Sequence, residues 1–257
     1  MGLFYLHYTH PVLQKNPLPS LRELALVSTF VASLYSAKAS ELPAVAPRFA
    51  VPILCTDSQL GARTRTRGTA VIVSSTGIIV TAAHVVSGSQ PPCKLTAVIP
   101  NAEWSRASAF RPFLLESCST NELLDIALCH IQPIGTGGEW SWVQAARVRI
   151  EIPPAESLIT ITGFTGWGFF PTVVRARMIS PRQRYRRQDG CYCDFAVDAV
   201  THEGMSGSPL VTEEGDVIGL ITTAGSGKFR GISFGTTFEG AAAFLRKAGL
   251  LVPPIQK

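Results

Sequence analysis

The stretch Gly204-Met205-Ser206-Gly207-Ser208-Pro209 places one serine between two glycines. A serine hydroxyl is a poor nucleophile at neutral pH, so an enzyme that uses one needs a nearby base and preorganised donors for the oxyanion. Glycine allows the tight turns that aim neighbouring backbone N–H groups at one point. Because a serine between glycines is also common in ordinary turns, Ser206 is a candidate nucleophile only if partners occur elsewhere.

Two further stretches supply such partners. Thr81-Ala82-Ala83-His84-Val85 follows an apolar run, and Asp125-Ile126-Ala127-Leu128 opens another. In a catalytic triad the histidine takes the hydroxyl proton, while the aspartate holds the imidazole tautomer and stabilises its charged form. The sequence therefore predicts a triad of His84, Asp125 and Ser206.

The order of the three residues distinguishes two architectures that carry such triads. The α/β-hydrolases place the nucleophile first, within a G-x-S-x-G elbow, whereas the chymotrypsin order is His, Asp, Ser. Here the residue two after Ser206 is Ser208, and His202 is the last histidine of the chain. The hydrolase elbow is therefore disfavoured.

These stretches resemble the motifs of trypsin-like serine peptidases of the chymotrypsin fold, most closely the bacterial branches with the HtrA proteases and glutamyl endopeptidases. The matching segments are 68–73 and 77–86 for the strands and histidine loop, 125–128 for the aspartate motif, and 207–210 and 217–220 for the serine loop and following strand. The resemblance spans residues 48–247. It implies an all-β fold of two six-stranded antiparallel barrels, a protein or peptide substrate, and no cofactor or metal.

Turn residues and the resemblance together divide the chain. They predict an N-terminal β-barrel (48–132), an inter-barrel linker (133–156), a C-terminal β-barrel (157–236) and a C-terminal helix (237–249). Asp189-Gly190 is a strong hairpin signal in the second barrel. Thr236 and Glu239 form a capping-box pattern before the helix, and no PDZ-like segment is expected after residue 247.

The N-terminal region has a different composition. Residues 24–35 are a run of twelve apolar and small side chains, too short to span a bilayer comfortably. Arg22 precedes the run and Ala37-Lys38-Ala39 follows it. This pattern predicts a cleaved signal peptide (1–39), a linker (40–47) and a secreted or periplasmic protein. An uncleaved membrane anchor and a packed helix are the alternatives, and no stable membrane span is expected.

Composition and charge set limits on fold and partners. The 257 residues are 46% hydrophobic and 16% charged, which suits one large or two small folded domains and excludes a disordered chain. The formal charge of +5 is modest, and no nucleic-acid partner is expected. Arginines cluster at 63–67 and 182–187. Three interpretations are open for them: solvated strand or loop residues, a rim of the substrate cleft, or a polyanion site. The sequence does not indicate an oligomeric state.

The oxyanion site and the substrate pocket follow from the resemblance. The backbone N–H groups of Gly204 and Ser206 are expected to receive the oxyanion. Met205 departs from the family, which usually has Asp or Asn before the nucleophile, so either the oxyanion pocket is preformed or the loop orders with substrate. The departure also leaves an alternative: a catalytically silent binding module for a protein or polyanion.

The resemblance places four residues at the pocket for the substrate residue before the scissile bond. These are Val200 at its base, and Ile221, Thr222 and Thr223 along a wall. An apolar base offers no partner for Lys or Arg, and the histidine of glutamyl endopeptidases is absent at Ile221. The expectation is a small or medium apolar residue.

The six cysteines allow either disulfides or a metal site. In an oxidising compartment up to three bridges are expected, with fifteen possible pairings. Cys191 and Cys193 should point to one face of a strand, so a bridge between them would be strained. Zinc is the minor alternative, since Cys191-Tyr192-Cys193 lacks the usual Cys-x-x-Cys spacing.

Overall fold

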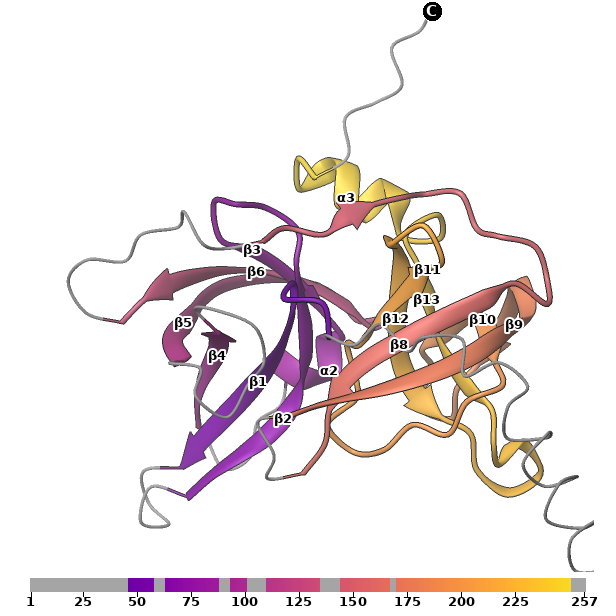
Figure 1. Cartoon of the computed structure of the whole chain (residues 1–257), viewed down its shortest axis with the longest axis horizontal. Coiled ribbons are helices and arrows are strands. Elements are labelled where there is room, and N and C mark those ends of the chain that lie inside the picture. The colour runs from indigo at the N-terminus through magenta and orange to yellow at the C-terminus, as the bar shows by residue number, and fades with distance from the viewer. Residues whose placement is uncertain are drawn as a thin grey trace, which may run out of the picture. The chain divides into compact units, whose positions relative to one another are not determined.

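The computed structural model describes residues 46–57, 63–87, 93–100, 110–134, 144–166 and 170–250. The predicted signal peptide and most of the linker after it lie outside these ranges. Within them, no helix has both the length and the apolar character needed to cross a membrane. The described elements are mostly strands, and these close into two barrels (Figure 1).

The first barrel contains six antiparallel strands joined in the order β1-β2-β3-β6-β5-β4. They are β1 (Ala50–Asp57), β2 (Arg63–Ile72), β3 (Ile78–Thr81), β4 (Lys94–Pro100), β5 (Phe110–Asn121) and β6 (Ile126–Pro133). Val, Ile and Thr dominate β2 and β3, as expected for strands packed on a core. Val71, Ile79 and Phe113 are among the fully buried side chains that fill this barrel.

The second barrel closes in the same way. Its strands are β8 (Leu158–Phe164), β9 (Pro171–Arg186), β10 (Tyr192–Val197), β11 (Pro209–Thr212), β12 (Asp216–Ala224) and β13 (Ser233–Thr237). The pairing of β11 with β12 completes the ring, and the short β7 (Arg147–Val148) lies parallel to β12 outside it. The predicted all-β fold of two six-stranded antiparallel barrels is confirmed.

Helical structure is limited to α2 (Ala83–Val86), the 3-10 turn η1 (Gly227–Phe229) and α3 (Ala242–Lys247) among the described residues. The C-terminal helix is shorter than the predicted 237–249, because the chain is still strand at Thr237. Thr236 does not cap this helix: it lies in β13, and its hydroxyl donates to the Leu124 carbonyl at 2.5 Å. Leu245 of α3 is 1% exposed and packs in the same apolar cluster as the first-barrel core.

The structure decides between alternatives that the sequence left open for the arginine segment and the cysteines. β9 extends to Arg186, so the exposed Arg182, Arg184 and Arg186 lie on a strand. Disulfides join Cys55 to Cys93 and Cys118 to Cys129, both in the first barrel. Cys191 and Cys193 are free thiols, so the predicted maximum of three bridges is not reached.

Candidate active site

His84 lies on the single helical turn α2, directly after β3. Its side chain is 43% exposed, which leaves the ring open to solvent on one side. The Arg67 guanidinium of β2 donates to the carbonyls of Val85 and Ser87, at 3.3 and 3.5 Å. Because the last carbonyls of a helix have no partners within it, Arg67 supplies those partners and holds the turn that carries the histidine.

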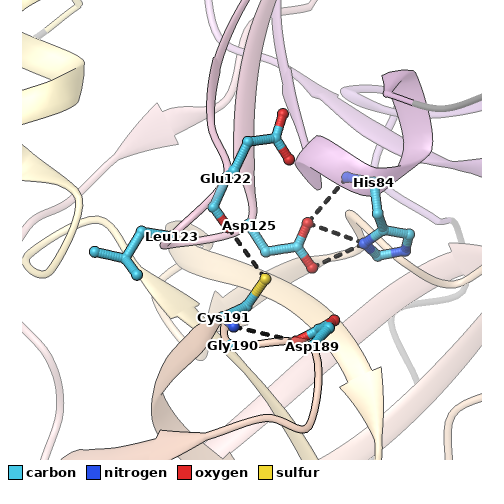
Figure 2. A pocket seen from close by; sticks show the side chains of 7 residues that line it. All are labelled: His84, Glu122, Leu123, Asp125, Asp189, Gly190 and Cys191. Atoms are coloured by element: carbon cyan, nitrogen blue, oxygen red, sulfur yellow. Dashed lines mark hydrogen bonds and ion pairs between the residues drawn. The ribbon is translucent and has the colours of Figure 1, made fainter.

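Asp125 ends the turn between β5 and β6, and its side chain is only 2% exposed. Its φ of 50° lies in the left-handed region, which Asp tolerates better than most residues. The His84 backbone N–H donates to Oδ1 at 3.0 Å. The His84 Nδ1 atom lies 2.9 Å from Oδ1 and 2.8 Å from Oδ2, and Figure 2 shows the ring facing the carboxylate. This geometry orients the imidazole.

The second barrel contributes a cation to the same carboxylate. Arg187 Nη1 lies 2.5 Å from Asp125 Oδ2, with the arginine side chain 20% exposed. Burial alone raises the pKa of Asp125, but hydrogen bonds from His84 and the charges of His84 and Arg187 outweigh it and hold the pKa below its usual value. The carboxylate is therefore ionised at neutral pH.

The serine loop is fixed by glycine conformation. Gly204 and Gly207 have φ values of 92° and 87°, where a side chain is strained. A Cβ on Gly204 would overlap the Phe164 carbonyl, and one on Gly207 would overlap that of Thr69. Met205 is fully buried in the core of the second barrel, so the residue that departs from the family pattern is a packing residue here.

Ser206 is brought to the first barrel through β2. The Thr69 N–H donates to the Ser206 carbonyl at 2.8 Å, and the Thr69 hydroxyl donates to the Gly204 carbonyl at 3.0 Å. A Cβ on Gly68 would overlap the Val85 side chain and lie 3.0 Å from the Ser206 carbonyl oxygen. The serine backbone and the side chain of the residue after His84 therefore both pack closely against this glycine.

The Ser206 hydroxyl donates to the Thr222 carbonyl at 3.4 Å. Between the described side chains of Ser206 and His84 no hydrogen bond forms. The N–H groups of Met205, Gly207 and Ser208 donate to backbone carbonyls, whereas those of Gly204 and Ser206 have no acceptor among the described residues. The two amides predicted for the oxyanion are thus the two in this loop without a described protein partner.

The four residues predicted for the substrate pocket are in different environments. Val200 is 56% exposed, on the surface. Ile221 is 1% exposed and packs in the second-barrel core, and Thr222 is 2% exposed, with its hydroxyl 3.5 Å from the Cys193 thiol. Thr223 is half-buried. Of these four residues, only Thr222 has a hydrogen bond to Ser206, which its carbonyl accepts.

An open depression of about 550 Å³ lies beside the His84–Asp125 pair. Its lining is His84, Glu122, Leu123, Asp125, Asp189, Gly190 and Cys191 (Figure 2). Sequence reasoning missed Arg187 and Cys191 as neighbours of Asp125 and its turn. The Asp189-Gly190 turn signal locates the hairpin, but no local pattern separates Arg187 from the other arginines. Among the described residues no group of three or more His, Cys, Asp or Glu side chains could hold a metal ion.

Comparison with known proteins supports the architecture. Residues 68–220, more than half of the chain, match the family described as trypsin-like peptidase domain. The magnetosome formation protease MamE of Paramagnetospirillum magneticum is 30% identical over 186 residues, which cover 69% of this chain and 23% of that protein. The chain thus spans about a quarter of the length of this relative.

A solved structure extends the comparison at the level of fold. The MamO protease domain of Magnetospirillum magneticum superposes with a TM-score of 0.60 at 17% identity, covering 79% of this chain and 99% of that one. At this identity the likeness concerns the fold alone. The matched residues 68–220, which include His84, Asp125 and Ser206, identify the chain as a member of the trypsin-like peptidase family.

Proposed function

We propose that this chain is an exported serine endopeptidase that uses His84, Asp125 and Ser206 as a triad. The observation that carries the proposal is the His84 imidazole held against a buried, ionised carboxylate: Nδ1 lies 2.8 Å from Asp125 Oδ2. A carboxylate in this position holds the imidazole tautomer whose Nε2 accepts a proton and stabilises the imidazolium that forms.

In the proposed reaction Ser206 rotates away from the Thr222 carbonyl and donates its proton to His84 as it attacks the peptide carbonyl. The N–H groups of Gly204 and Ser206 receive the oxyanion, and loss of one such donor costs about 10²- to 10³-fold in rate. His84 then protonates the leaving amine, and water hydrolyses the acyl-enzyme by the same route. The glycine conformations at 204 and 207 and the buried Met205 favour a preformed oxyanion site.

For substrate selection we propose a small or medium apolar residue before the scissile bond. The segment 221–223 would form one wall through its backbone and Thr223, since Ile221 packs inwards. A peptide-library digest checks this, and cuts mainly after Arg, Lys or Glu would contradict it.

Export is supported by the two disulfides, which persist in oxidising compartments and are rare in the cytosol. Mass spectrometry of the protein recovered from outside the cytoplasm is expected to find the N-terminus at residue 40. Retention of Met1 would contradict cleavage of a signal peptide.

A fluorophosphonate probe, which reacts with an activated serine, tests the peptidase proposal. We expect labelling of the natural chain and none of Ser206→Ala, with His84→Ala also unlabelled because the serine then lacks its base. Labelling of neither the natural chain nor Ser206→Ala would favour the alternative, a silent binding module. That alternative has one observation in its favour: Ser206 and His84 are not hydrogen-bonded to each other.

A further inference from the structure

Two parts of the second barrel, residues 187–192 and Thr236 of β13, together contact every residue of the turn that carries Asp125. The turn comprises residues 122–125, between β5 and β6. Its contacts are Cys191 Sγ to the Glu122 carbonyl (3.1 Å; Figure 2), Tyr192 N–H to the Leu123 carbonyl (2.8 Å), the Thr236 hydroxyl to the Leu124 carbonyl (2.5 Å) and Arg187 to the Asp125 carboxylate (2.5 Å). The aspartate is therefore positioned by both barrels.

Arg187 is itself held in one place. Its Nη2 lies 2.6 Å from Asp189 Oδ2, while Asp189 Oδ1 accepts the Cys191 N–H at 3.1 Å. The Arg187 N–H donates to the Cys191 carbonyl at 2.8 Å, which closes the hairpin between β9 and β10. A guanidinium is planar and presents its donors in a fixed fork, so Asp189 on one branch fixes the direction of the other.

The fixed branch determines how the Asp125 carboxylate lies. Oδ1 accepts from the His84 backbone N–H at 3.0 Å, and Oδ2 accepts from Arg187. A carboxylate rotates about a broad two-fold torsion unless both oxygens are bonded. With the two oxygens held from opposite barrels, the carboxylate keeps the orientation in which the His84 Nδ1–H reaches it.

We propose that Arg187, braced by Asp189, is a positioning residue that locks the Asp125 carboxylate toward His84 from the second barrel. The side-chain partners of Arg187 among the described residues are Asp125 and Asp189, so it acts through Asp125. The chemical role assigned to that carboxylate rests on the proposed function. The lock itself is a property of the folded chain and can be measured without catalysis.

The charge of Arg187 has a second consequence. The pKa of Asp125 is held down against burial by His84 and Arg187, and the pKa of Arg187 is raised by Asp125 and Asp189 despite burial of the guanidinium. Removing the cation therefore takes away one of the interactions that hold down the pKa of Asp125. The other titratable groups facing the pair or Arg187 are Glu122 on the turn, Asp189 in the hairpin, and Cys191 and Cys193 at the start of β10.

The test uses the Ser206→Ala chain, so that its outcome does not depend on turnover. The His84 Nδ1 proton, shared with a carboxylate, is followed by proton NMR as a far-downfield signal while the pH is lowered. In Arg187→Gln we expect the signal to broaden and to disappear at a higher pH than in the parent chain, because a positive charge that favours the ionised Asp125 carboxylate is lost. Arg187→Lys, which keeps the charge without the fork, should lie between the two.

Arg182→Gln is the matched control, because Arg182 lies on β9, just before the hairpin that carries Arg187, is 57% exposed and pairs with Glu239 rather than with Asp125. It should leave the signal unchanged. Asp189→Asn removes the brace and should broaden the signal less than Arg187→Gln. If Arg187→Gln does not fold, the lysine variant and Asp189→Asn carry the test.

An unchanged signal and pH range in these variants would overturn the proposal, as would the absence of a downfield signal in the parent chain. In the chain with Ser206 intact, Arg187→Gln should lower kcat about tenfold and change KM less than twofold. Probe labelling of the natural chain reports separately on the proposed function, so a catalytically silent chain with a normal NMR response would reject the peptidase and retain the lock.

Discussion

The two halves of the candidate site are held by different kinds of force. The half with His84 and Asp125 depends on charge and side-chain hydrogen bonds, since a buried carboxylate is bonded by a histidine and an arginine. The half with Ser206 depends on backbone shape: two glycines at positive φ, a buried methionine and carbonyls that accept neighbouring amides. The first half should therefore be sensitive to pH and to substitutions that remove a charge. The second half should be sensitive to substitutions that add side-chain atoms to the serine loop.

Removing the charge of Asp125 gives the largest expected effect. Asp125→Asn keeps the shape but presents an N–H₂ group to His84, which favours the wrong tautomer, and we expect kcat to fall about 10⁴-fold. Steady-state kinetics on a peptide substrate measures this, with circular dichroism to verify folding. Glu213→Gln, at an exposed turn, is the control and should match the natural chain. A loss of less than tenfold would mean that the carboxylate does not orient the histidine.

Adding one methyl group to the serine loop gives the next effect. Gly207→Ala places a Cβ into the Thr69 carbonyl at a φ of 87°, and we expect about 3 kcal/mol or more of destabilisation from overlap and backbone strain together. Urea unfolding of the Ser206→Ala chain measures this free energy without self-digestion.

Gly215→Ala is the matched control, since Gly215 has a φ of 84° with no atom within 4 Å of the added Cβ. This variant should lose only the free energy of unfolding that backbone strain at a positive φ costs, about 1 kcal/mol. Equal losses in the two variants would show that packing of the serine loop against β2 is unimportant, and would undo the contrast between the two halves of the site.

The same contrast explains what the sequence could predict. The serine half can be recognised from a run of consecutive residues, because the local backbone requires glycine at 204 and 207. His84 and Asp125 are also recognisable, since each follows or opens an apolar strand. Arg187 is not, because its role depends on a hairpin of one barrel meeting a turn of the other, and Arg182, Arg184 and Arg186 look the same in sequence. The start of the C-terminal helix is likewise set by tertiary packing, since the Thr236 hydroxyl bonds the Leu124 carbonyl instead of capping the helix.

Two carboxylates, the buried Asp125 and the half-buried Asp194, give a smaller effect with opposite signs. The pKa of Asp125 is lowered, so the stability it contributes is present above the unfolded value of about 3.9 and is lost as pH falls through the folded pKa. Burial raises the pKa of Asp194 despite hydrogen bonds from Thr237, so its contribution is present below about 3.9 and is lost as pH rises through its folded pKa.

Urea unfolding of the Ser206→Ala chain between pH 3 and 7 separates the two carboxylates. The stability difference between this chain and its Asp125→Asn variant should shrink as the pH falls below about 4. The contribution of Asp194, measured against Asp194→Asn, should instead shrink as the pH rises above about 4. A difference for Asp125→Asn that is constant with pH would show that its charge does not contribute to stability.

The smallest effect concerns the two free thiols, of which Cys191 is half-buried and Cys193 is buried. Burial raises the pKa of Cys193 to about 11, and burial also raises the pKa of the half-buried Cys191, which lines the depression beside His84. Since the thiolate is the reactive form, N-ethylmaleimide should modify Cys191 slowly at neutral pH and Cys193 only after unfolding. Intact mass should show one adduct in the native chain and two in denaturant without reductant, because the other four cysteines are bridged.

The native adduct also reports on the site. A maleimide on Cys191 occupies space beside His84 but leaves the serine loop untouched, so fluorophosphonate uptake should slow a fewfold rather than stop. Cys191→Ser should be insensitive to the reagent. Complete loss of uptake would mean that the adduct breaks the hairpin and with it the contact of Arg187 to Asp125, which would place the charged half of the site under the control of a single exposed turn.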